Sequence, residues 1–474
     1  MINSKRDSRQ AANKLCYECG DKLCAVMWRL VPVSFFSVFS DTEKGTTMTE
    51  IHITEEKKNS TAVLVGVETP EMRDGECDAS LDELERLAET AGAVVAARLV
   101  QSREKPDVRT VIGSGKVAEL KTICSECGAE LCIFDCEMSP SQIRNVEDEV
   151  GEVRVIDRSM LILDIFALHA ATAEGKLQVE LAQLKYTAPR LIGKGKQLSR
   201  LGGGIGTRGP GESKLESDKR HLARRVASLE AELEAVENTR RTTRSARDRS
   251  GLPHVAIVGY TNAGKSTLLN RLTDAGILAE DKLFATLDPT TRKFTLPGGE
   301  SVLLTDTVGF IRKLPHHLVK AFRSTLEEAA LSDILLHIVD ASDPEYPDEM
   351  KVTEELLAEL GAGGKPMLIV YNKCDREADG IHAPALTPNG SNRAVCVSAL
   401  TGQGVDEMVA MLEAIVREGK VRVTFRFPNS EAGALSSLYR MAAVESVEYG
   451  DEYITAVAVA DAKTRGVLAA YELK

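Results

Sequence analysis

The segment from Gly259 to Thr267, GYTNAGKST, has the glycine spacing and the lysine and hydroxyl side chains that phosphate binding requires. The apolar run HVAIVG precedes it and LLNRL follows it, so a strand, a glycine loop and a helix are expected in that order. In this arrangement loop amides and the helix N-terminus face the α- and β-phosphates, Lys265 bridges β- and γ-phosphate oxygens, and the Ser266 hydroxyl ligates Mg²⁺. We therefore predict a nucleoside triphosphate site with bound magnesium.

Two further segments could complete the magnesium site. Asp306 ends the apolar run in LLTDTVGF, where its carboxylate could hold the water shell of Mg²⁺, and the Gly309 amide could reach the γ-phosphate. Between this motif and the glycine loop lies LFATLDPTT, in which Thr286 is the predicted second hydroxyl ligand, released when the γ-phosphate is lost. Thr290 and Thr291 are the alternatives.

Asn372-Lys373-Cys374-Asp375 follows the apolar run PMLIVY and predicts selection of guanine. The Asp375 carboxylate can accept hydrogen bonds from guanine N1 and N2, whereas adenine would present it with an acceptor, and buried unpaired groups are costly. The Lys373 stem can cover the base, and Asn372 can tie this loop to the glycine loop.

Ser398-Ala399-Leu400, after the short run RAVCV, is expected to supply a backbone donor to guanine O6. The four motifs together predict a GTPase in which Lys265, Thr286 and Gly309 are catalytic. The residues predicted to contact the nucleotide are Gly259, Tyr260, Thr261, Asn262, Ala263, Gly264, Lys265, Ser266, Thr267, Phe284, Ala285, Thr286, Leu287, Asp288, Asp306, Thr307, Val308, Gly309, Asn372, Lys373, Cys374, Asp375, Ser398, Ala399 and Leu400. Ser266 and Thr286 are the predicted Mg²⁺ ligands, and Asp306 is predicted to act on the ion through water.

The position after D-x-x-G carries Phe310, where Ras-like GTPases place a glutamine that orients the attacking water. An apolar ring cannot polarise water, so we expect slow intrinsic hydrolysis. The missing element could come from another residue, a bound cation or a partner. Asn262 resembles the asparagine with which some related GTPases hold a potassium ion, which makes K⁺ a candidate second cofactor.

The elements before the glycine loop form two blocks. From Thr61 to Ile156, short apolar runs alternate with helix-like stretches such as LDELERLAETAG, which indicates a parallel α/β sheet. Within this block, VIGSGKVAEL is either a weak phosphate-binding turn or, as we prefer, a plain βα turn with Ser114 as the helix N-cap. The block also holds Cys124, Cys127, Cys132 and Cys136, of which the last two fall in a strand-like run; buried apolar cysteine is favoured there over a zinc site.

From Leu168 to Arg249, strand patterns disappear. Leu222, Val226, Leu229, Leu233 and Val236 recur at alternating spacings of four and three, which predicts one long helix packed on another formed by 175–189. The segment between them, about 190–216, is rich in glycine and basic residues. Since 185–225 carries eleven Lys and Arg against three Asp and Glu in a chain of net charge −12, we expect this loop to bind the phosphates of RNA, with a mobile linker as the alternative. The predicted RNA contacts are Lys194, Lys196, Arg200 and Arg208.

The two ends of the chain carry weaker patterns. Residues 1–47, with Cys16, Cys19 and Cys24, are assigned no function, and zinc binding there is disfavoured; no apolar run is long enough to span a membrane. The C-terminal runs VRVTFRF, AAVESVEY, EYITAVAVA and GVLAAYEL predict four strands around a short helix. The expected fold class is α/β: an N-terminal α/β domain with a long helical hairpin, a P-loop GTPase domain with a Ras-like parallel sheet, and a small α+β domain. The expected divisions are 1–47, 48–167, 168–249, 250–418 and 419–474.

Several of these runs together resemble the HflX family of translation-associated GTPases. They are VELAQLKYTAPRL, GKGKQLSRLGGGIGTRGPGESKLESDKR, GYTNAGKST, FATLDPTTR and DTVGFIRKLPHHLVKAFRSTLEEA, and GGGIGTRGPGE is more specific than any of the nucleotide motifs. The resemblance covers about Ala62 to the C-terminus. It implies binding to the large ribosomal subunit, with the hairpin loop near the peptidyl transferase region, and roles in splitting or rescuing stalled ribosomes or in subunit maturation. Adenine nucleotide binding by the N-terminal domain has been suggested for family members.

Two functions therefore remain in view. The first is a ribosome-acting GTPase of the cytoplasm, monomeric when free, whose slow hydrolysis the ribosome stimulates. The second is a regulatory or signalling GTPase that binds a protein partner and uses the basic loop on anionic lipid at the membrane periphery. The glycine-rich loop lacks the amphipathic helix that membrane binding favours, so the first is preferred.

Overall fold

The computed structural model describes residues 60–192, 210–248, 252–273, 283–315, 318, 323–379, 393–418, 420–460 and 462–473. The chain divides into two compact units between Leu168 and His169. The N-terminal extension with Cys16, Cys19 and Cys24, and the four residues predicted to contact RNA, Lys194, Lys196, Arg200 and Arg208, lie outside the described residues. None of the helices in the described ranges is long and apolar enough to cross a membrane.

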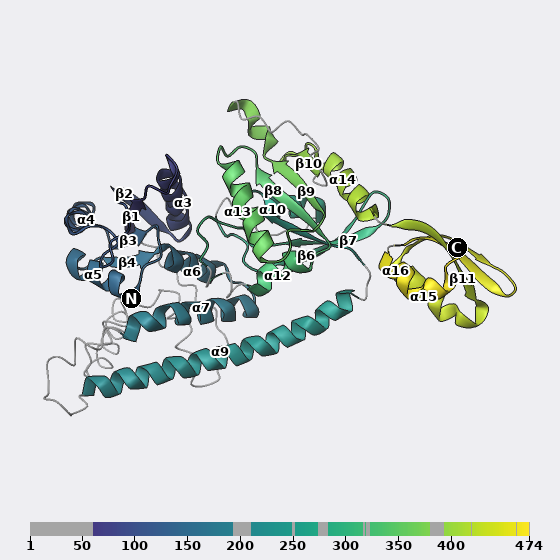
Figure 1. The fold of residues 1–474 in the computed structure, drawn as a ribbon, viewed down its shortest axis with the longest axis horizontal. Helices are drawn as coiled ribbons and strands as arrows, with labels where there is room; N and C mark the ends of the chain where they lie inside the picture. Colours follow the sequence, from purple (N-terminus) through teal and green to yellow (C-terminus); the bar gives the residue numbers. More distant parts are fainter. Residues whose placement is uncertain are drawn as a thin grey trace, which may run out of the picture. The chain divides into compact units, whose positions relative to one another are not determined.

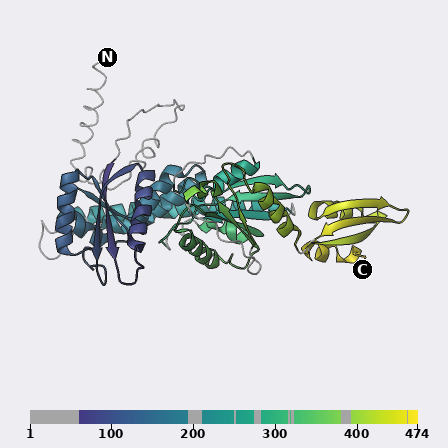
Figure 2. The same ribbon diagram turned by 90° about the horizontal axis from the view of Figure 1, so that it is seen from above.

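The first unit is a four-stranded, fully parallel sheet in the order β2-β1-β3-β4. Its central strand has no polar face: Ala62, Val63, Leu64 and Val65 are all at most 1% exposed, because helices lie on both sides of the sheet (Figure 2). The expected parallel α/β fold is confirmed. The elements are β1 (Ser60–Glu68), α3 (Glu76–Thr90), β2 (Ala93–Ser102), α4 (Ser114–Cys127), β3 (Leu131–Phe134), α5 (Pro140–Val150), β4 (Arg154–Asp157) and α6 (Arg158–His169).

Two details of this unit bear on the sequence predictions. Ser114 is not the N-cap of α4: the cap is Gly113, no side chain caps the helix, and the Gly113 amide donates instead to Gln101 Oε1 at 2.8 Å. That partner comes from the neighbouring strand and could not be read from local sequence. Cys132 on β3 and Cys124 on α4 are buried with their sulfur atoms 3.3 Å apart, as apolar core residues.

Buried ionic groups lie at the carboxyl ends of β3 and β4. Arg158, only 2% exposed, pairs through Nη1 with Asp135 Oδ1 at 2.7 Å and through Nη2 with Glu83. Asp135 also accepts from Ser80 Oγ at 2.6 Å. The next carboxylate, Asp157, accepts the backbone amides of Met138 and Met160, each at 3.0 Å. These contacts supply the partners that buried charges need.

The second unit begins with a helical hairpin of α7 (Ala173–Ile192) and α9 (Pro210–Asp248), drawn side by side in Figure 1. Ion pairs join the two helices, including Arg225 to Glu180 and Lys185 to Glu230, both at 2.7 Å. The predicted seam is confirmed, since its five residues are buried or half-buried while most of their neighbours on α9 are exposed. Pro189, predicted to end the first helix, lies inside α7.

The central sheet of this unit has six strands in the order β10-β9-β8-β5-β7-β6, parallel except for the edge pair β6 and β7. Apolar residues of β5, β8 and β9 are almost fully buried, as expected for strands covered on both faces. The elements are β5 (His254–Gly259), α10 (Lys265–Thr273), β6 (Thr290–Thr295), β7 (Ser301–Asp306), α12 (Arg323–Leu331), β8 (Ile334–Asp340), α13 (Tyr346–Glu359), β9 (Met367–Asn372), η2 (Cys374–Asp379), β10 (Arg393–Cys396) and α14 (Val405–Arg417).

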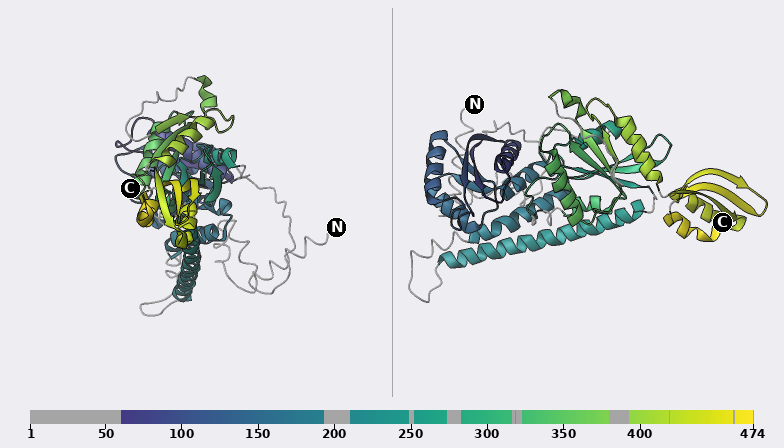
Figure 3. Two further views of the ribbon diagram at one scale, coloured as in Figure 1. Left: turned by 90° about the vertical axis from the view of Figure 1, so that its right-hand side faces the viewer. Right: turned by 45° about the horizontal axis from the view of Figure 1, so that its top comes forward.

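The C-terminal part is a three-stranded antiparallel sheet, β11-β13-β12, with helices on one face (Figure 3). The predicted fourth strand is wrong: 466–473 holds the end of α16 and the 3₁₀ turn η4. Leu468 and Tyr471, three residues apart, both pack on the sheet, a helical rather than an alternating period. The elements are β11 (Val421–Pro428), η3 (Asn429–Glu431), α15 (Ala432–Met441), β12 (Ala443–Tyr449), β13 (Tyr453–Ala460), α16 (Ala462–Val467) and η4 (Ala469–Tyr471).

Candidate functional site

The glycine loop joins β5 to α10, and its two outer glycines have positive φ angles that favour glycine. Gly259 has φ 146°, and a Cβ there would lie 2.1 Å from the Ile338 carbonyl oxygen of the adjacent strand. Gly264 has φ 92°, and a Cβ there would lie 2.2 Å from Asn372 Nδ2. Both positions therefore exclude a side chain, and the loop stays close to the ends of β8 and β9.

Lys265 is the first residue of α10 and is only 6% exposed. Its Nζ donates to the Tyr260 carbonyl at 2.6 Å, so the ammonium group is held beneath the loop. Burial lowers the pKa of Lys265 to about 8, although the carboxylates of Asp306 and Glu349 act in the opposite direction. A buried cation without full compensation is suited to bind an incoming phosphate.

Three oxygen-bearing side chains converge beside Lys265. Ser266 Oγ donates to Asp306 Oδ2 at 2.6 Å and lies 2.9 Å from Thr286 Oγ1. Burial raises the pKa of Asp306, opposed by Lys265 and by hydrogen bonds from Ser266 and Thr286. Within the described residues Asp306 Oδ1 is buried without a hydrogen-bond partner, an orphaned acceptor at the centre of a hard-oxygen cluster.

The alternatives to Thr286 lie elsewhere. Thr290 is the first residue of β6, and Thr291 Oγ1 is paired with Thr305 Oγ1 at 2.9 Å. Thr286 alone among the three is hydrogen-bonded to Ser266 in the described structure. The donor set Ser266, Thr286 and Asp306 therefore has the composition and proximity of a Mg²⁺ site.

Gly309 and Phe310 pack on the glycine loop in different ways. A Cβ at Gly309 would lie 2.7 Å from Thr261 Cα and 2.9 Å from Lys265 Nζ, so only glycine fits there. Phe310 exchanges backbone hydrogen bonds with the loop, accepting from the Thr261 amide at 2.8 Å and donating to the Gly259 carbonyl at 3.1 Å. Its ring is 1% exposed, so it occupies the core and cannot orient a water molecule.

Asn372 ties three segments together, of which only its link to the glycine loop was expected. Its Nδ2 donates to the Ala263 carbonyl at 2.8 Å, and its Oδ1 accepts from the Ala399 amide at 2.9 Å. The phosphate loop and both base-side loops thus share one side chain. The Ala399 amide donates to Asn372, a contact between distant segments that no local sequence pattern predicts.

The remaining base-side residues have distinct environments. Lys373 has φ 65°, and its Nζ lies 2.6 Å from Asp340 Oδ2. Asp375 is exposed, whereas Cys374 is buried and directs its thiol to the Tyr371 carbonyl at 3.2 Å. Ser398 Oγ accepts from the Thr401 amide at 3.1 Å, which shapes the turn that carries Leu400.

Arg271 is a further residue of the site, which no sequence motif indicates. It lies on the last turn of α10 and donates through Nε to the Ala399 carbonyl at 2.6 Å and through Nη2 to Leu400. Its spacing from Lys265 places it on the helix, but its partners are separated from it by 128 and 129 residues, so no local pattern could have identified the contact.

Many of the residues predicted to contact the phosphates line a single cleft. Asp288 is not on its wall: its carboxylate points to the start of α7 instead. Leu287, Val308 and the side chain of Cys374 are buried core groups. The cleft is lined by Thr261, Asn262, Gly264, Lys265, Ser266, Thr267, Phe284, Ala285, Thr286, Thr307 and Gly309.

Family models match successive parts of the chain. Residues 78–167 match the GTP-binding GTPase N-terminal model, 169–247 the GTP-binding GTPase middle region, and 254–373 the model described as 50S ribosome-binding GTPase. Among solved structures, a GTP-binding protein from the archaeon Sulfolobus solfataricus in complex with GDP aligns with 76% of this chain and 99% of its own at 26% identity, with a TM-score of 0.39.

Curated relatives named GTPase HflX match most of the chain. The protein from Escherichia coli is 42% identical over 81% of this chain and 89% of its own length. The protein from Lacrimispora saccharolytica is 52% identical over 83% of this chain and 91% of its own length. From this extent of identity and from the three models in succession, the chain belongs to the HflX family of GTPases.

Proposed function

We propose that this GTPase binds GTP as its magnesium complex, hydrolyses it slowly when alone, and acts on the large ribosomal subunit. The observation that carries the proposal is the convergence of Ser266, Thr286 and Asp306 beside the buried Lys265. The ribosomal partner is supported by the model matched at 254–373, described as 50S ribosome-binding GTPase.

Magnesium would be held by the Ser266 and Thr286 hydroxyls, with Asp306 acting through the metal's water shell. When bound, the ion supplies positive charge to the phosphate oxygens as the terminal phosphate leaves. Lys265 adds a second positive charge, and the Gly309 amide would contact the γ-phosphate; the close approach of Gly309 to Thr261 and Lys265 supports this role. The orphaned Asp306 Oδ1 is the feature that best fits a resident cation.

Guanine selection is assigned to the loop after β9. The exposed Asp375 carboxylate can accept from guanine N1 and N2, while adenine would leave it facing an acceptor. Lys373 covers the base with its stem, and Ser398, Ala399 and Leu400 form the opposite wall. Asn372 holds both walls to the phosphate loop, so base and phosphate recognition are coupled.

Slow hydrolysis follows from the burial of Phe310, which leaves the usual water-orienting position without a polar group. We propose that the ribosome supplies or orders the missing element. A potassium ion held with the help of Asn262, which lies on the cleft wall with φ 61°, is a further contribution to test.

The hairpin is proposed to carry the basic loop to ribosomal RNA, with Lys194, Lys196, Arg200 and Arg208 as the contacts. The support is the charge and glycine content of that segment and the stiff pair of helices that bears it. Subunit splitting, rescue and subunit maturation are the outcomes that such binding serves. We propose a cytoplasmic protein that is monomeric when free, with domains near 48–167, 168–249, 250–418 and 419–474.

The test is GTP turnover by the full chain alone, with large subunits and with whole ribosomes, with subunit dissociation followed by light scattering and sedimentation. We expect strong stimulation by large subunits and, for a splitting role, dissociation that depends on GTP. Lys194, Lys196, Arg200 and Arg208 exchanged together for Gln should weaken co-sedimentation while basal turnover stays unchanged.

Two results would contradict the proposal in different ways. Turnover without stimulation and without co-sedimentation would remove the ribosomal role and favour the regulatory alternative, for which vesicles of anionic lipid are the next partner to test. Turnover that does not require Mg²⁺ or does not distinguish GTP from ATP would remove the assignment of the site itself.

A further inference from the structure

Asp288 makes contacts that GTP binding does not explain. Its Oδ2 accepts the backbone amides of Ala171 and Thr172 at 2.9 and 2.8 Å, and its Oδ1 accepts from the Thr172 hydroxyl. These partners are separated from it by 117 and 116 residues. A carboxylate from the segment after Thr286 therefore sits at the N-terminus of α7, where amides and the helix dipole favour negative charge.

The start of α7 is shaped for this carboxylate. Thr172 Oγ1 also accepts from the Gly175 amide at 2.9 Å, so one hydroxyl serves both the helix and Asp288. A Cβ at Gly175 would lie 2.5 Å from Asp288 Oδ1 and 3.2 Å from Thr172 Oγ1. Glycine in the first turn of a helix lowers helix stability, and here its absence of a side chain is what admits the carboxylate.

The segment between the two contacts is short. Thr286 is hydrogen-bonded to Ser266 in the cleft, and Asp288 is bonded to α7 two residues later. Pro289 follows, which restricts the backbone of Asp288 to extended conformations. With one end fixed on α7 and little rotational freedom between, the Thr286 hydroxyl is held toward the metal-binding cluster.

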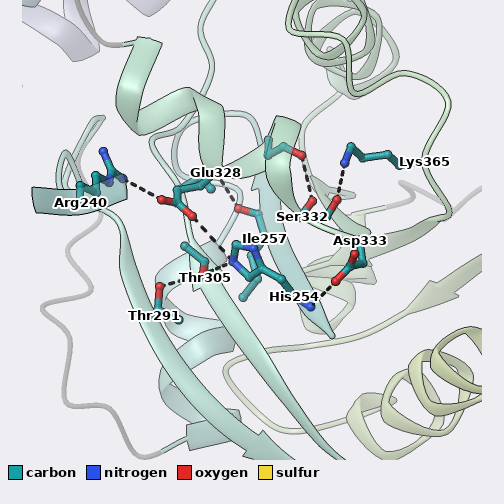
Figure 4. Close-up of polar contacts among 11 residues, drawn as sticks. Arg240, His254, Ile257, Thr291, Thr305, Glu328, Ser332, Asp333 and Lys365 are labelled. Atoms are coloured by element: carbon teal, nitrogen blue, oxygen red, sulfur yellow. Dashed lines mark hydrogen bonds and ion pairs between the residues drawn. The ribbon is translucent and has the colours of Figure 1, made fainter. Parts of the chain in front are cut away.

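A second polar bridge joins the hairpin to the same core (Figure 4). Arg240 of α9 donates to Glu328 of α12 at 2.8 Å. It also donates to Glu174 of α7 at 3.0 Å. Glu328 is 3% exposed, and His254 lies 3.9 Å from its other oxygen. The contacts of Arg240 hold the C-terminal part of α9 to α12 and to α7. Asp288 is therefore not the only residue that holds α7 against the sheet.

We propose that Asp288 is a positioning residue for GTP hydrolysis, which uses the N-terminus of α7 to hold Thr286 in place for the magnesium complex of GTP. The inference rests on the proposed nucleotide site.

The first test compares Gly175→Ala with the wild-type full chain. The added methyl group displaces the Asp288 carboxylate but stabilises α7, because alanine favours helix over glycine. We expect Mg²⁺-dependent affinity for a fluorescent non-hydrolysable GTP analogue to fall about fivefold to tenfold, with lower kcat and a higher Mg²⁺ requirement. GDP affinity should stay unchanged, since Thr286 matters only while the γ-phosphate is present.

Variants of Thr172 and Asp288 themselves provide a second test. Thr172→Val and Asp288→Asn should reproduce the selective loss of GTP affinity, and Thr172→Ser should restore it. The matched control is Asp107→Asn, because Asp107 likewise accepts two backbone amides, of Arg109 and Thr110, at 2.9 and 3.3 Å, but lies in the first unit. It should leave both affinities unchanged.

The outcomes separate two failures. If wild-type protein shows no Mg²⁺-dependent binding of the GTP analogue, the proposed site is wrong. If it does, and Gly175→Ala, Thr172→Val and Asp288→Asn bind the analogue as tightly as wild type or lose GDP and the analogue equally, the positioning role is overturned.

Discussion

The two parallel sheets of this protein use the carboxyl ends of their strands in opposite ways. In the first unit, Asp135 and Glu83 are bonded to Arg158, and Asp157 accepts two backbone amides. In the central sheet, Asp306 at the end of β7 has an oxygen left without a hydrogen-bond partner among the described residues. The same architecture therefore gives a closed ionic core in one unit and an open site in the other.

The two sheets differ in whether the chain itself or a ligand supplies the partner of the buried carboxylate. A buried carboxylate satisfied by its own chain has little left to offer a ligand, and removing its partner is strongly destabilising because an uncompensated charge stays buried. A buried carboxylate or lysine that is left under-compensated costs stability but gains when a ligand arrives. Substitutions in the two places should therefore affect different measurements: unfolding in the first unit and ligand affinity in the second.

The largest expected effect is that of Arg158→Met on stability. The change leaves Glu83 and Asp135 buried without their counter-charge, which typically costs about 3–5 kcal/mol. Hydrogen exchange of β1 and β3 should show that loss, while GTP affinity stays within about twofold of wild type. Arg98→Met, which removes an exposed arginine paired with Asp82 and Glu85, is the control and should cost about 1 kcal/mol or less. Equal costs for the two variants would contradict the closed-core interpretation.

His337 gives the next largest effect, at acid pH. It is 1% exposed on β8, and in the described ranges its Nδ1 has no hydrogen-bond partner. Burial, aided by the charge of Lys265, lowers the pKa of His337 to about 4, below the usual 6.5. The unfolded chain therefore takes up a proton first, so stability falls as pH drops from 6.5 to about 4, by up to about 3 kcal/mol.

His337→Leu should remove that part of the pH dependence. The variant should match or exceed the wild type in stability at pH 7, because an unpaired polar atom is replaced by an apolar group of similar size. Urea denaturation between pH 7 and 4 is the measurement. Wild-type and variant profiles that run parallel over this range would show that the pKa of His337 is the same in the folded and unfolded states, which would contradict the prediction.

Asp306→Asn should weaken ligand binding and not folding. We expect a loss of about 2 kcal/mol in the affinity for Mg²⁺ and GTP together, roughly thirtyfold, because one charged group of the metal site becomes neutral. Folding stability should be equal or higher, since the charge is buried and only partly compensated. Asp157→Asn in the first unit should do the reverse, lowering stability and leaving nucleotide binding intact. Titration calorimetry measures the binding and urea denaturation the stability of both variants. A loss of stability in Asp306→Asn, or a loss of binding in Asp157→Asn, would contradict this assignment.

The smallest expected effect concerns monovalent cations. Replacing sodium by potassium should raise basal GTP turnover by roughly threefold, less than 1 kcal/mol in activation free energy. Asn262→Ala should remove the difference between the two salts. Equal rates for the wild type in both salts would exclude a potassium ion from the site.

Local patterns were sufficient for much of this molecule. The glycine loop, the strand that precedes it and the helix seam at Leu229 depend on residues close in sequence, and the fold class followed from them. The contacts that join distant segments were not accessible. Asp288 was expected to contact the nucleotide, yet its carboxylate accepts backbone amides at the start of α7. Arg271 and Arg240 also have partners that only the folded chain brings near.

The length of α9 has a mechanical consequence. The helix has 39 residues, so it extends about 58 Å, and its N-terminal end lies about 45 Å along the axis from Arg240. If α9 tilts about Arg240 by only about 5°, its N-terminal end moves by roughly 4 Å, which is the scale of a hydrogen-bonded contact. A displacement of that size is enough, in geometric terms, to make or break a hydrogen-bonded contact at the N-terminal end of the helix.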